Sequence, residues 1–270
     1  MIGSSMEASE LEQRIAAFPR WHYPFTFANG VATPIPHRAM VNRQEQRRRY
    51  FFERLLELTG GSLKGRRVLD MGCNAGYFSL LAIEAGADYV LGVDGQQAYV
   101  EQAQLVFEAK GIDPTRYRFE QGDVLEQELG TDFDLVLCLG VMDRLAKPVE
   151  LFERIAGAGA ELVVIDTEVS RARLPLFEVS TLYDTSDVMG YPLVLIPSRE
   201  ALSELAAQLG FKTVALALNI TDFTGMSDYH RERRLAFICS KGPSLEGVPA
   251  QPPAPSVPWW LRKPKALLSS

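Results

Sequence analysis

An acid and several small residues separate two apolar runs in VLDMGCNAGYFSL, residues 68–80. Asp70 ends the first run, and Gly72 and Gly76 flank Asn74. This order predicts a buried strand, a tight turn and the first turn of a helix, which together bring backbone N–H groups close to a ligand. A dinucleotide-binding turn would need glycine in place of Asn74, and a phosphate-binding loop would need Gly-Lys-Ser/Thr. The pattern suits a ligand that has an adenosine and a cationic amino-acid end.

Two further acids end the next two strand-like runs. Asp94 closes LGVD, and Asp123 closes QGD. An acid after the second strand can accept hydrogen bonds from both hydroxyls of a ribose. An acid after the third can accept from an adenine amino group, with Val124 covering the ring. Each acid alone could instead cap the following turn or helix, but three acids at successive strand ends favour a nucleoside site.

The elements that must position these acids alternate between strand and helix. Strands are expected over 66–71, 87–94, 116–123, 132–140 and 160–166, and helices over 42–61, 76–86, 96–111 and 147–157. A helix over 198–210 and strands over 211–220 and 233–240 follow. This alternation predicts an α/β fold, a mostly parallel, doubly wound sheet whose last two strands form an antiparallel edge pair.

The chain divides by composition into one main domain and two flanking segments. Residues 1–42 are rich in aromatic residues and proline, loosely organised, and expected to cover the active site. The main domain spans 43–241, and within it the long connection 167–197 is expected to be a substrate lid. Residues 242–270 are rich in proline and without periodicity, so we expect a disordered tail.

Composition limits the classes of function. The formal net charge of −6 disfavours a surface devoted to nucleic acid. The N-terminus does not read as a signal peptide, and no apolar run is long enough to span a membrane. The three cysteines are widely spaced, so neither a disulfide framework nor a metal site is expected. A cytoplasmic location follows as an expectation.

Over roughly residues 43–240 the sequence resembles the class I S-adenosylmethionine-dependent methyltransferases. VLDMGCNAG resembles their first motif, and FDLVLCLGVMDRL resembles their fourth. The resemblance implies a Rossmann-like methyltransferase fold and S-adenosyl-L-methionine as cofactor. It implies cofactor contacts by Trp21, Tyr23, Asp70, Gly72, Cys73, Asn74, Gly76, Asp94, Gly95, Gln96, Asp123, Val124 and Leu139.

A narrower resemblance concerns the branch that contains tRNA wobble-uridine carboxymethyltransferases. GCNAGYFS, LGVMDRLAKP and WHYPFTFANGVATP are similar to segments of that branch. The tRNA enzymes have Tyr-His where this chain has Asp143 and Arg144, and a lysine where it has Tyr23. An acid at position 143 would repel the extra carboxylate of carboxy-S-adenosylmethionine. We therefore expect ordinary methyl transfer.

Methyl transfer to oxygen or nitrogen needs a positioned acceptor and a base that removes its proton. Histidine is the natural base near neutral pH. His22 and His37 flank the segment expected to fold over the cofactor, and Asp143 follows the fourth strand. These three are the predicted catalytic residues, and Tyr23 and Tyr191 are competing candidates.

The arginines at positions 43, 47, 48, 49 and 54 could meet a phosphate, a sugar acid or RNA, although a solvated helix face is the commoner use of such a run. The favoured function is O-methylation of a small-molecule or glycan-like acceptor. A tRNA wobble-uridine (carboxy)methyltransferase is the alternative, which leaves nucleic acid as a less favoured partner. A cofactor-binding scaffold without catalysis is a third reading. The sequence does not predict the oligomeric state.

Overall fold

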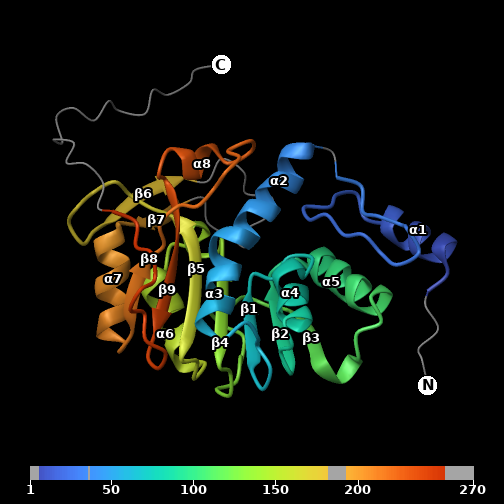
Figure 1. Cartoon of the computed structure of the whole chain (residues 1–270), viewed down its shortest axis with the longest axis horizontal. Helices are drawn as coiled ribbons and strands as arrows, with labels where there is room; N and C mark the ends of the chain where they lie inside the picture. Colours follow the sequence, from blue (N-terminus) through green and yellow to red (C-terminus); the bar gives the residue numbers. More distant parts are fainter. Residues whose placement is uncertain (1–5, 36, 182–192, 253–270) are drawn as a thin grey trace.

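The computed structural model describes residues 6–35, 37–181 and 193–252, and its centre is a seven-stranded sheet (Figure 1). The strand order is β3-β2-β1-β4-β5-β9-β8. The strands are β1 (Arg67–Met71), β2 (Tyr89–Asp94), β3 (Tyr117–Gln121), β4 (Leu135–Leu139), β5 (Leu162–Glu168), β8 (Lys212–Ala215) and β9 (Arg234–Ser240). The first five are parallel, and β9 runs antiparallel to both of its neighbours, β5 and β8. The predicted α/β fold and antiparallel edge pair are confirmed, with β9 inserted between β5 and β8.

Helices cover both faces of this sheet because its central strands are apolar on both sides. Alternate strand residues, such as Val68 and Leu69 of β1, belong to two separate apolar clusters. One cluster contains residues of α4 (Tyr77–Glu84) and α5 (Gln97–Ala109). The other contains residues of α6 (Pro148–Gly157) and α7 (Arg199–Gln208). The sheet is therefore doubly wound, as predicted.

The N-terminal segment is more ordered than predicted. Residues Ala8–Ala16 form helix α1, whose Leu11 and Ile15 are buried. The expectation of a loosely organised segment was wrong here because these two apolar residues, one helical turn apart, pack into the core. The predicted helix over 42–61 begins earlier, as α2 (Arg38–Arg47), and continues through a π-helical turn (Arg48–Phe52) into α3 (Glu53–Leu58).

The long connection after β5 contains a second, two-stranded antiparallel sheet. It consists of β6 (Phe177–Thr181) and β7 (Leu193–Pro197), and residues 182–192 lie outside the described residues. The Leu195 N–H donates to the carbonyl of Leu145 at 3.2 Å, which joins β7 to the 3-10 turn Met142–Arg144 after β4. The short elements 114–116 and α8 (Ser227–His230) complete the description.

The first part of the predicted disordered tail follows a defined path along β8. The Ala217 N–H donates to the Pro249 carbonyl, and the Gln251 N–H donates to the Ala215 carbonyl, each at 2.8 Å. Arg199 holds the Gln251 carbonyl as well. The prediction of disorder from residue 242 was therefore wrong for 242–252, because this segment satisfies the backbone groups of an edge strand. The remainder, 253–270, lies outside the described residues.

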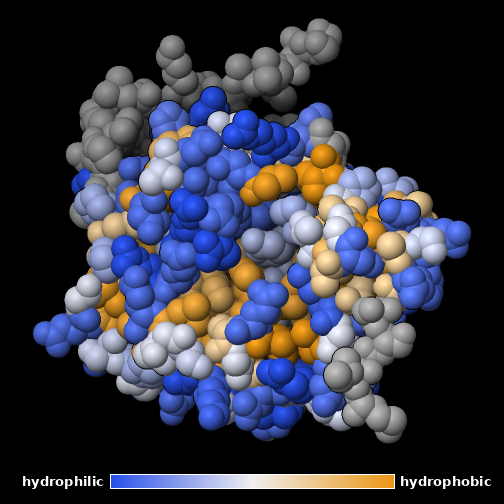
Figure 2. Space-filling view, turned by 45° about the vertical axis from the view of Figure 1, so that its right-hand side comes forward, coloured by the Kyte–Doolittle hydropathy of each residue, from blue (hydrophilic) through white to orange (hydrophobic). Residues whose placement is uncertain are grey.

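On the face shown in Figure 2, hydrophilic side chains cover much of the upper part and apolar side chains gather lower down. Within residues 6–35, 37–181 and 193–252, no helix is long and apolar enough to cross a membrane. The same part of the chain contains no group of three or more His, Cys, Asp or Glu arranged to hold a metal ion.

Candidate functional site

A cavity of about 420 Å³ opens at the carboxyl ends of the parallel strands, where α/β sheets bind ligands. The N-terminal segment, α2, β9 and the loops after β1 to β4 all contribute to its wall. The lining residues are Arg20, His22, Tyr23, Met40, Arg43, Gln44, Arg47, Gly72, Asn74, Asp94, Gly95, Tyr99, Gly122, Asp123, Val124, Leu139, Gly140, Val141, Arg144, Leu145 and Arg234.

Asp94 is fixed in this wall by the backbone around it. Its two carboxylate oxygens accept hydrogen bonds from the N–H groups of Asn74 and Gln96, each at 2.9 Å. The N–H groups of Gly72 and Cys73 donate to the Val93 carbonyl at 2.8 and 3.1 Å, which ties the turn after β1 to β2. Asp94 therefore caps the neighbouring turns and also lines the cavity, while its contact with a ribose stays a prediction.

Gly72 lets the turn after β1 approach the loop after β4. Its φ is +72°, and a Cβ at this position would lie 2.4 Å from Cγ2 of Val141. Asn74 also has positive φ, at 47°, a conformation that asparagine tolerates better than most residues. Both residues line the cavity. The close approach that the structure shows is to Val141, and the predicted approach of a ligand stays a prediction.

Asp123 and Val124 line the same part of the cavity after β3. The Asp123 carboxylate accepts the Leu125 N–H at 2.9 Å, and Val124 is buried. Gly95 and Leu139, from the loops after β2 and β4, are also at the wall. Together with Tyr23, Gly72, Asn74 and Asp94, these are the predicted cofactor residues that the structure gathers around the cavity. We call the part with Asp94, Gly95, Asp123 and Val124 the acidic end.

Asp70 lies beneath the turn and does not line the cavity. Only 2% of it is exposed, and its carboxylate accepts a hydrogen bond from the Ser79 hydroxyl at 2.6 Å. Burial raises the pKa of Asp70 to about 6, against the lowering effect of Ser79. The structure thus gives this strand-end acid a supporting position between β1 and α4, without the direct ligand contact that was predicted.

Four other predicted cofactor residues are also absent from the cavity wall. Trp21 is buried in the core, where its indole N–H donates to the Ile15 carbonyl at 3.2 Å. Cys73 is buried too, and burial raises the pKa of its thiol well above the ordinary value. Gly76 begins α4 with φ +75°, packed against Ala103 and aromatic rings of the core. Gln96 caps α5 with its backbone. These four predictions misplace core and capping residues.

Of the candidate bases, His22 and Tyr23 line the cavity. Nδ1 of His22 lies 3.4 Å from Nδ2 of Asn74, and its ring lies 5.3 Å from that of Tyr99. Tyr23 stacks on Tyr77 at 5.3 Å. His37, by contrast, is an exposed residue at the start of α2 and is not part of the wall. Tyr191 lies outside the described residues.

Asp143 is buried behind the cavity wall and is not one of the lining residues. Its carboxylate forms an ion pair with Arg234 and accepts from the Thr167 hydroxyl at 3.4 Å. The prediction of a base at this position fails on geometry because the carboxylate is occupied by a buried arginine. For the same reason its charge is not free to repel a carboxylated ligand, and the argument against such a donor loses this support.

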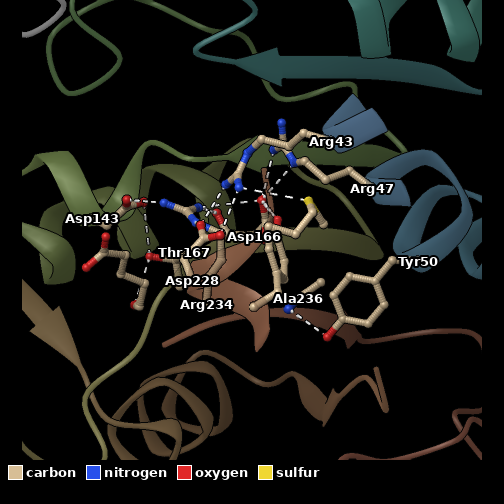
Figure 3. A network of polar contacts seen from close by, with 12 residues as sticks. Arg43, Arg47, Tyr50, Asp143, Asp166, Thr167, Asp228, Arg234 and Ala236 are labelled. Carbon is tan, nitrogen blue, oxygen red and sulfur yellow. Dashed lines mark hydrogen bonds and ion pairs between the residues drawn. The ribbon is translucent and has the colours of Figure 1, made fainter. Parts of the chain in front are cut away.

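Asp143 belongs to a network of three arginines and three carboxylates (Figure 3). Arg43 forms two bonds to Asp228, at 2.8 and 2.7 Å. Arg234 reaches Asp228 at 3.1 Å in addition to its pair with Asp143. Burial would raise the pKa of Asp228, but Arg43 and Arg234 outweigh it and lower this pKa to about 2. The Asp228 carboxylate is therefore ionised at neutral pH.

Asp166 of β5 is the fully buried centre of the same network. Arg47 pairs with it at 2.8 Å, and the Tyr229 hydroxyl donates to both of its oxygens at 2.8 Å. Burial lowers the pKa of Arg47, but Asp166 outweighs this and holds it above the ordinary value. The network thus joins α2 to β5, α8 and β9 while Arg43, Arg47 and Arg234 line the cavity.

Sequence reasoning missed many of the lining residues. They are Arg20, Met40, Gln44, Tyr99, Gly122, Gly140, Val141, Arg144, Leu145 and Arg234, whereas Arg43 and Arg47 were named only as possible contacts of a phosphate, a sugar acid or RNA. The arginine run contained a usable signal, because Arg43 and Arg47 are one helical turn apart and share a face. Arg48 and Arg49 instead pair with Glu45 on the outer side of the helix. Nothing local in the sequence indicated Arg234.

Comparison with known proteins supports the class that this geometry suggests. Residues 62–190 match the family model of a methyltransferase domain. A tRNA U34 carboxymethyltransferase of Proteus mirabilis is 29% identical over 161 residues, which cover 57% of this chain and 47% of the relative. A ubiquinone biosynthesis O-methyltransferase of Acinetobacter baylyi is 32% identical over 93 residues, covering 34% of this chain and 39% of the relative. The chain spans about half the length of the curated relatives that it matches.

A solved structure with a similar fold is the N-terminal domain of EvdMO1, crystallised in the presence of SAH and D-fucose. The TM-score is 0.64 at 18% sequence identity, over 88% of this chain and 98% of that domain. The fold, the glycine turn and the matched domain model together support a class I S-adenosylmethionine-dependent methyltransferase domain.

Proposed function

We propose that the protein transfers a methyl group from S-adenosyl-L-methionine to an oxygen of a small-molecule or glycan-like acceptor. The observation that supports this best is the cavity itself. Asp94, Asp123 and the glycine turn line one part of it. Arg43, Arg47, Arg144 and Arg234 line another part. Its volume of about 420 Å³ lies within the usual range of small-ligand sites.

The residues at the acidic end fit the cofactor. Asp94 lines the cavity, and a carboxylate there can accept hydrogen bonds from the two ribose hydroxyls. Asp123 would accept from the adenine amino group while Val124 covers the ring. Gly72 and Asn74, on the turn, would face the amino-acid end. When bound, the cofactor supplies a methyl group already activated by a sulfonium charge.

The protein's own part is to hold the acceptor in line and to remove its proton. His22 is the best-placed base, since it lines the cavity next to Asn74, and Tyr23 is the competing one. The described parts of the predicted lid, residues 167–181 and 193–197, are joined to the cavity residue Leu145 through β7 and would lie next to the acceptor. A cytoplasmic location remains part of this proposal.

The tRNA wobble-uridine reading is the second candidate. Two observations favour it. The Proteus mirabilis relative is a tRNA U34 carboxymethyltransferase, and the arginines of the cavity could bind a carboxylated donor or tRNA phosphates. Competition between S-adenosylmethionine and its carboxylated analogue for the purified protein separates the readings. We expect S-adenosylmethionine to bind more tightly, and a clear preference for the analogue would promote the tRNA reading.

Calorimetry tests the proposed function itself. S-adenosylmethionine and S-adenosylhomocysteine should bind at micromolar levels and raise the melting temperature by mass action, whereas NAD should do neither. A protein that binds NAD but neither sulfur compound would contradict the proposal.

A further inference from the structure

We propose that the acceptor has an anionic oxygen group, a carboxylate or a phosphate, that binds to an arginine wall in the cavity. The arginine wall consists of Arg43, Arg47, Arg144 and Arg234, all of which line the cavity. This inference deepens the proposed function and rests on it, because it assigns a substrate class to the same site.

The wall presents positive charge to the cavity because its counter-charges lie behind it. Asp143 is 6% exposed, Asp166 is fully buried, and neither they nor Asp228 line the cavity. A guanidinium has five N–H donors in a planar fork, so one that is bonded to a carboxylate on one side can still donate on another. The cavity therefore meets guanidinium groups, while Asp143 and Asp166 are buried and the half-buried Asp228 lies outside the cavity wall.

These guanidinium groups are held before any ligand arrives. Arg47 is bound to Asp166 and to the side chain of Gln44 at 3.1 Å, and Arg43 is bound to Asp228 and to the Gly225 carbonyl at 2.9 Å. Side chains fixed in this way lose little entropy when they bind a ligand. Planar arginine forks match the geometry of carboxylate and phosphate oxygens.

Arg144 is the residue of the wall that a purely structural role does not account for. The positions of Arg43, Arg47 and Arg234 could be explained by the ion pairs that join α2 to the sheet. Arg144 is exposed, lines the cavity, and has no carboxylate partner within the described ranges. An anionic acceptor would supply that partner. Repulsion from Asp94 and Asp123 would keep such an acceptor away from the acidic end and so orient it.

Matched pairs of small acceptors test this inference on the whole chain of residues 1–270 saturated with S-adenosylhomocysteine. The probes are 3,4-dihydroxybenzoate with its carboxamide, D-glucuronate with D-glucuronamide, and inorganic phosphate, each titrated by calorimetry. Charge-assisted hydrogen bonds to a fixed guanidinium predict that at least one acid binds about tenfold more tightly than its amide. Phosphate binding more tightly than both acids would identify phosphate as the group.

Two variants with the same change of charge locate the effect. Arg144→Gln should remove most of the preference for anions and leave the affinity for S-adenosylhomocysteine unchanged. Arg49→Gln is the control, because Arg49 is exposed, pairs with Glu45 and does not line the cavity. It should keep the preference.

The outcomes distinguish this inference from the proposed function. Failure to bind S-adenosylhomocysteine would contradict the proposed function. If S-adenosylhomocysteine binds, three results would overturn the inference about the arginine wall alone. These are no binding of any anion, equal binding of acids and amides, and an unchanged preference for acids in Arg144→Gln. The inference would also be overturned if a carboxylated donor binds tightly through Arg144 while the acids do not bind.

Discussion

The two ends of the cavity are built in opposite ways. At the acidic end, Asp94 accepts hydrogen bonds from the backbone N–H groups of Asn74 and Gln96. These two residues are 20 and 2 positions away along the chain. In the arginine wall, Arg47 and its partner Asp166 are 119 positions apart along the chain, and Arg43 and Asp228 are 185 apart. The acidic end thus comes from short-range contacts around the turn after β1, whereas the arginine wall depends on contacts between distant elements. The following predictions test that contrast.

The largest effect is expected from breaking the centre of the network. Asp166→Ala would leave Arg47 without its buried counter-charge, remove one of the carboxylates near Arg234 and leave Tyr229 without its acceptor. Removing one partner of a buried ion pair costs about 3–5 kcal/mol. We expect a loss of this size in the free energy of unfolding, measured with urea. Arg49→Ala, which breaks an exposed pair, should cost less than about 1 kcal/mol, and equal losses would contradict the contrast.

The next effect is a dependence of stability on pH that has opposite signs at two acids outside the cavity wall, Asp70 beneath the turn after β1 and Asp228 behind the arginine wall. The folded-state pKa of Asp70 is raised from 3.8 to about 6, so the folded chain keeps a proton that the unfolded chain has lost. Its contribution to stability is present below pH 4 and falls as the pH rises to about 6, by up to about 3 kcal/mol at about 1.4 kcal/mol per pKa unit. Asp70→Asn should remove this fall.

Asp228 provides the opposite case in the same experiment. Its pKa is lowered from 3.8 to about 2, so its contribution is present above pH 3.8 and is lost as the pH falls toward 2. Asp228→Asn should therefore flatten the acid limb of the unfolding curve and leave the interval from pH 4 to 6 unchanged. If the two variants alter the same interval, the assignment of these pKa shifts is wrong.

A smaller effect is expected on cofactor affinity. Asp94→Asn keeps the size of the side chain and one backbone bond but removes the charge that would hold the ribose. Such contacts are worth about 1.5–3 kcal/mol, so the dissociation constant of S-adenosylhomocysteine should rise at least about tenfold with an unchanged circular dichroism spectrum. Arg144→Gln is the matched control at the other end, and it should leave this constant unchanged. An Asp94→Asn protein with the original affinity would reduce Asp94 to a turn cap.

The smallest effect compares two glycines that have similar backbone angles. Gly72→Ala would add a Cβ 2.4 Å from Val141, whereas Gly111→Ala, at φ +67°, would meet nothing within 4 Å. Both pay about 1 kcal/mol for the left-handed conformation, and overpacking should add roughly 1–2 kcal/mol at Gly72 alone. Urea unfolding of the two variants measures the difference. Equal losses would show that the loop after β4 moves away without cost.

The sequence predicted the fold well because it is made of consecutive strands and helices with clear periodicity. It was less reliable on the site. Asp70, Asp94 and Asp123 all end strands, yet only the latter two line the cavity. A strand-end position says which edge of the sheet an acid occupies but not whether its side chain meets the ligand or a neighbour such as Ser79. Trp21 was predicted to contact the cofactor but is buried in the core. The sequence does not distinguish an aromatic residue that lines a site from one that packs in the core beside it.

The sequence by itself determined the strand-turn-helix unit, the positions of its glycines and the acids of the acidic end. Short-range hydrogen bonds and backbone angles depend mainly on residues that are close in the sequence. Only the tertiary structure decided that Asp143 is neutralised by Arg234 and that the arginines at 43 and 47 face the cavity while those at 48 and 49 face outward. Coulomb pairing acts between whichever charges the fold brings together, and β9, which supplies Arg234, reaches β5 only when the sheet is complete.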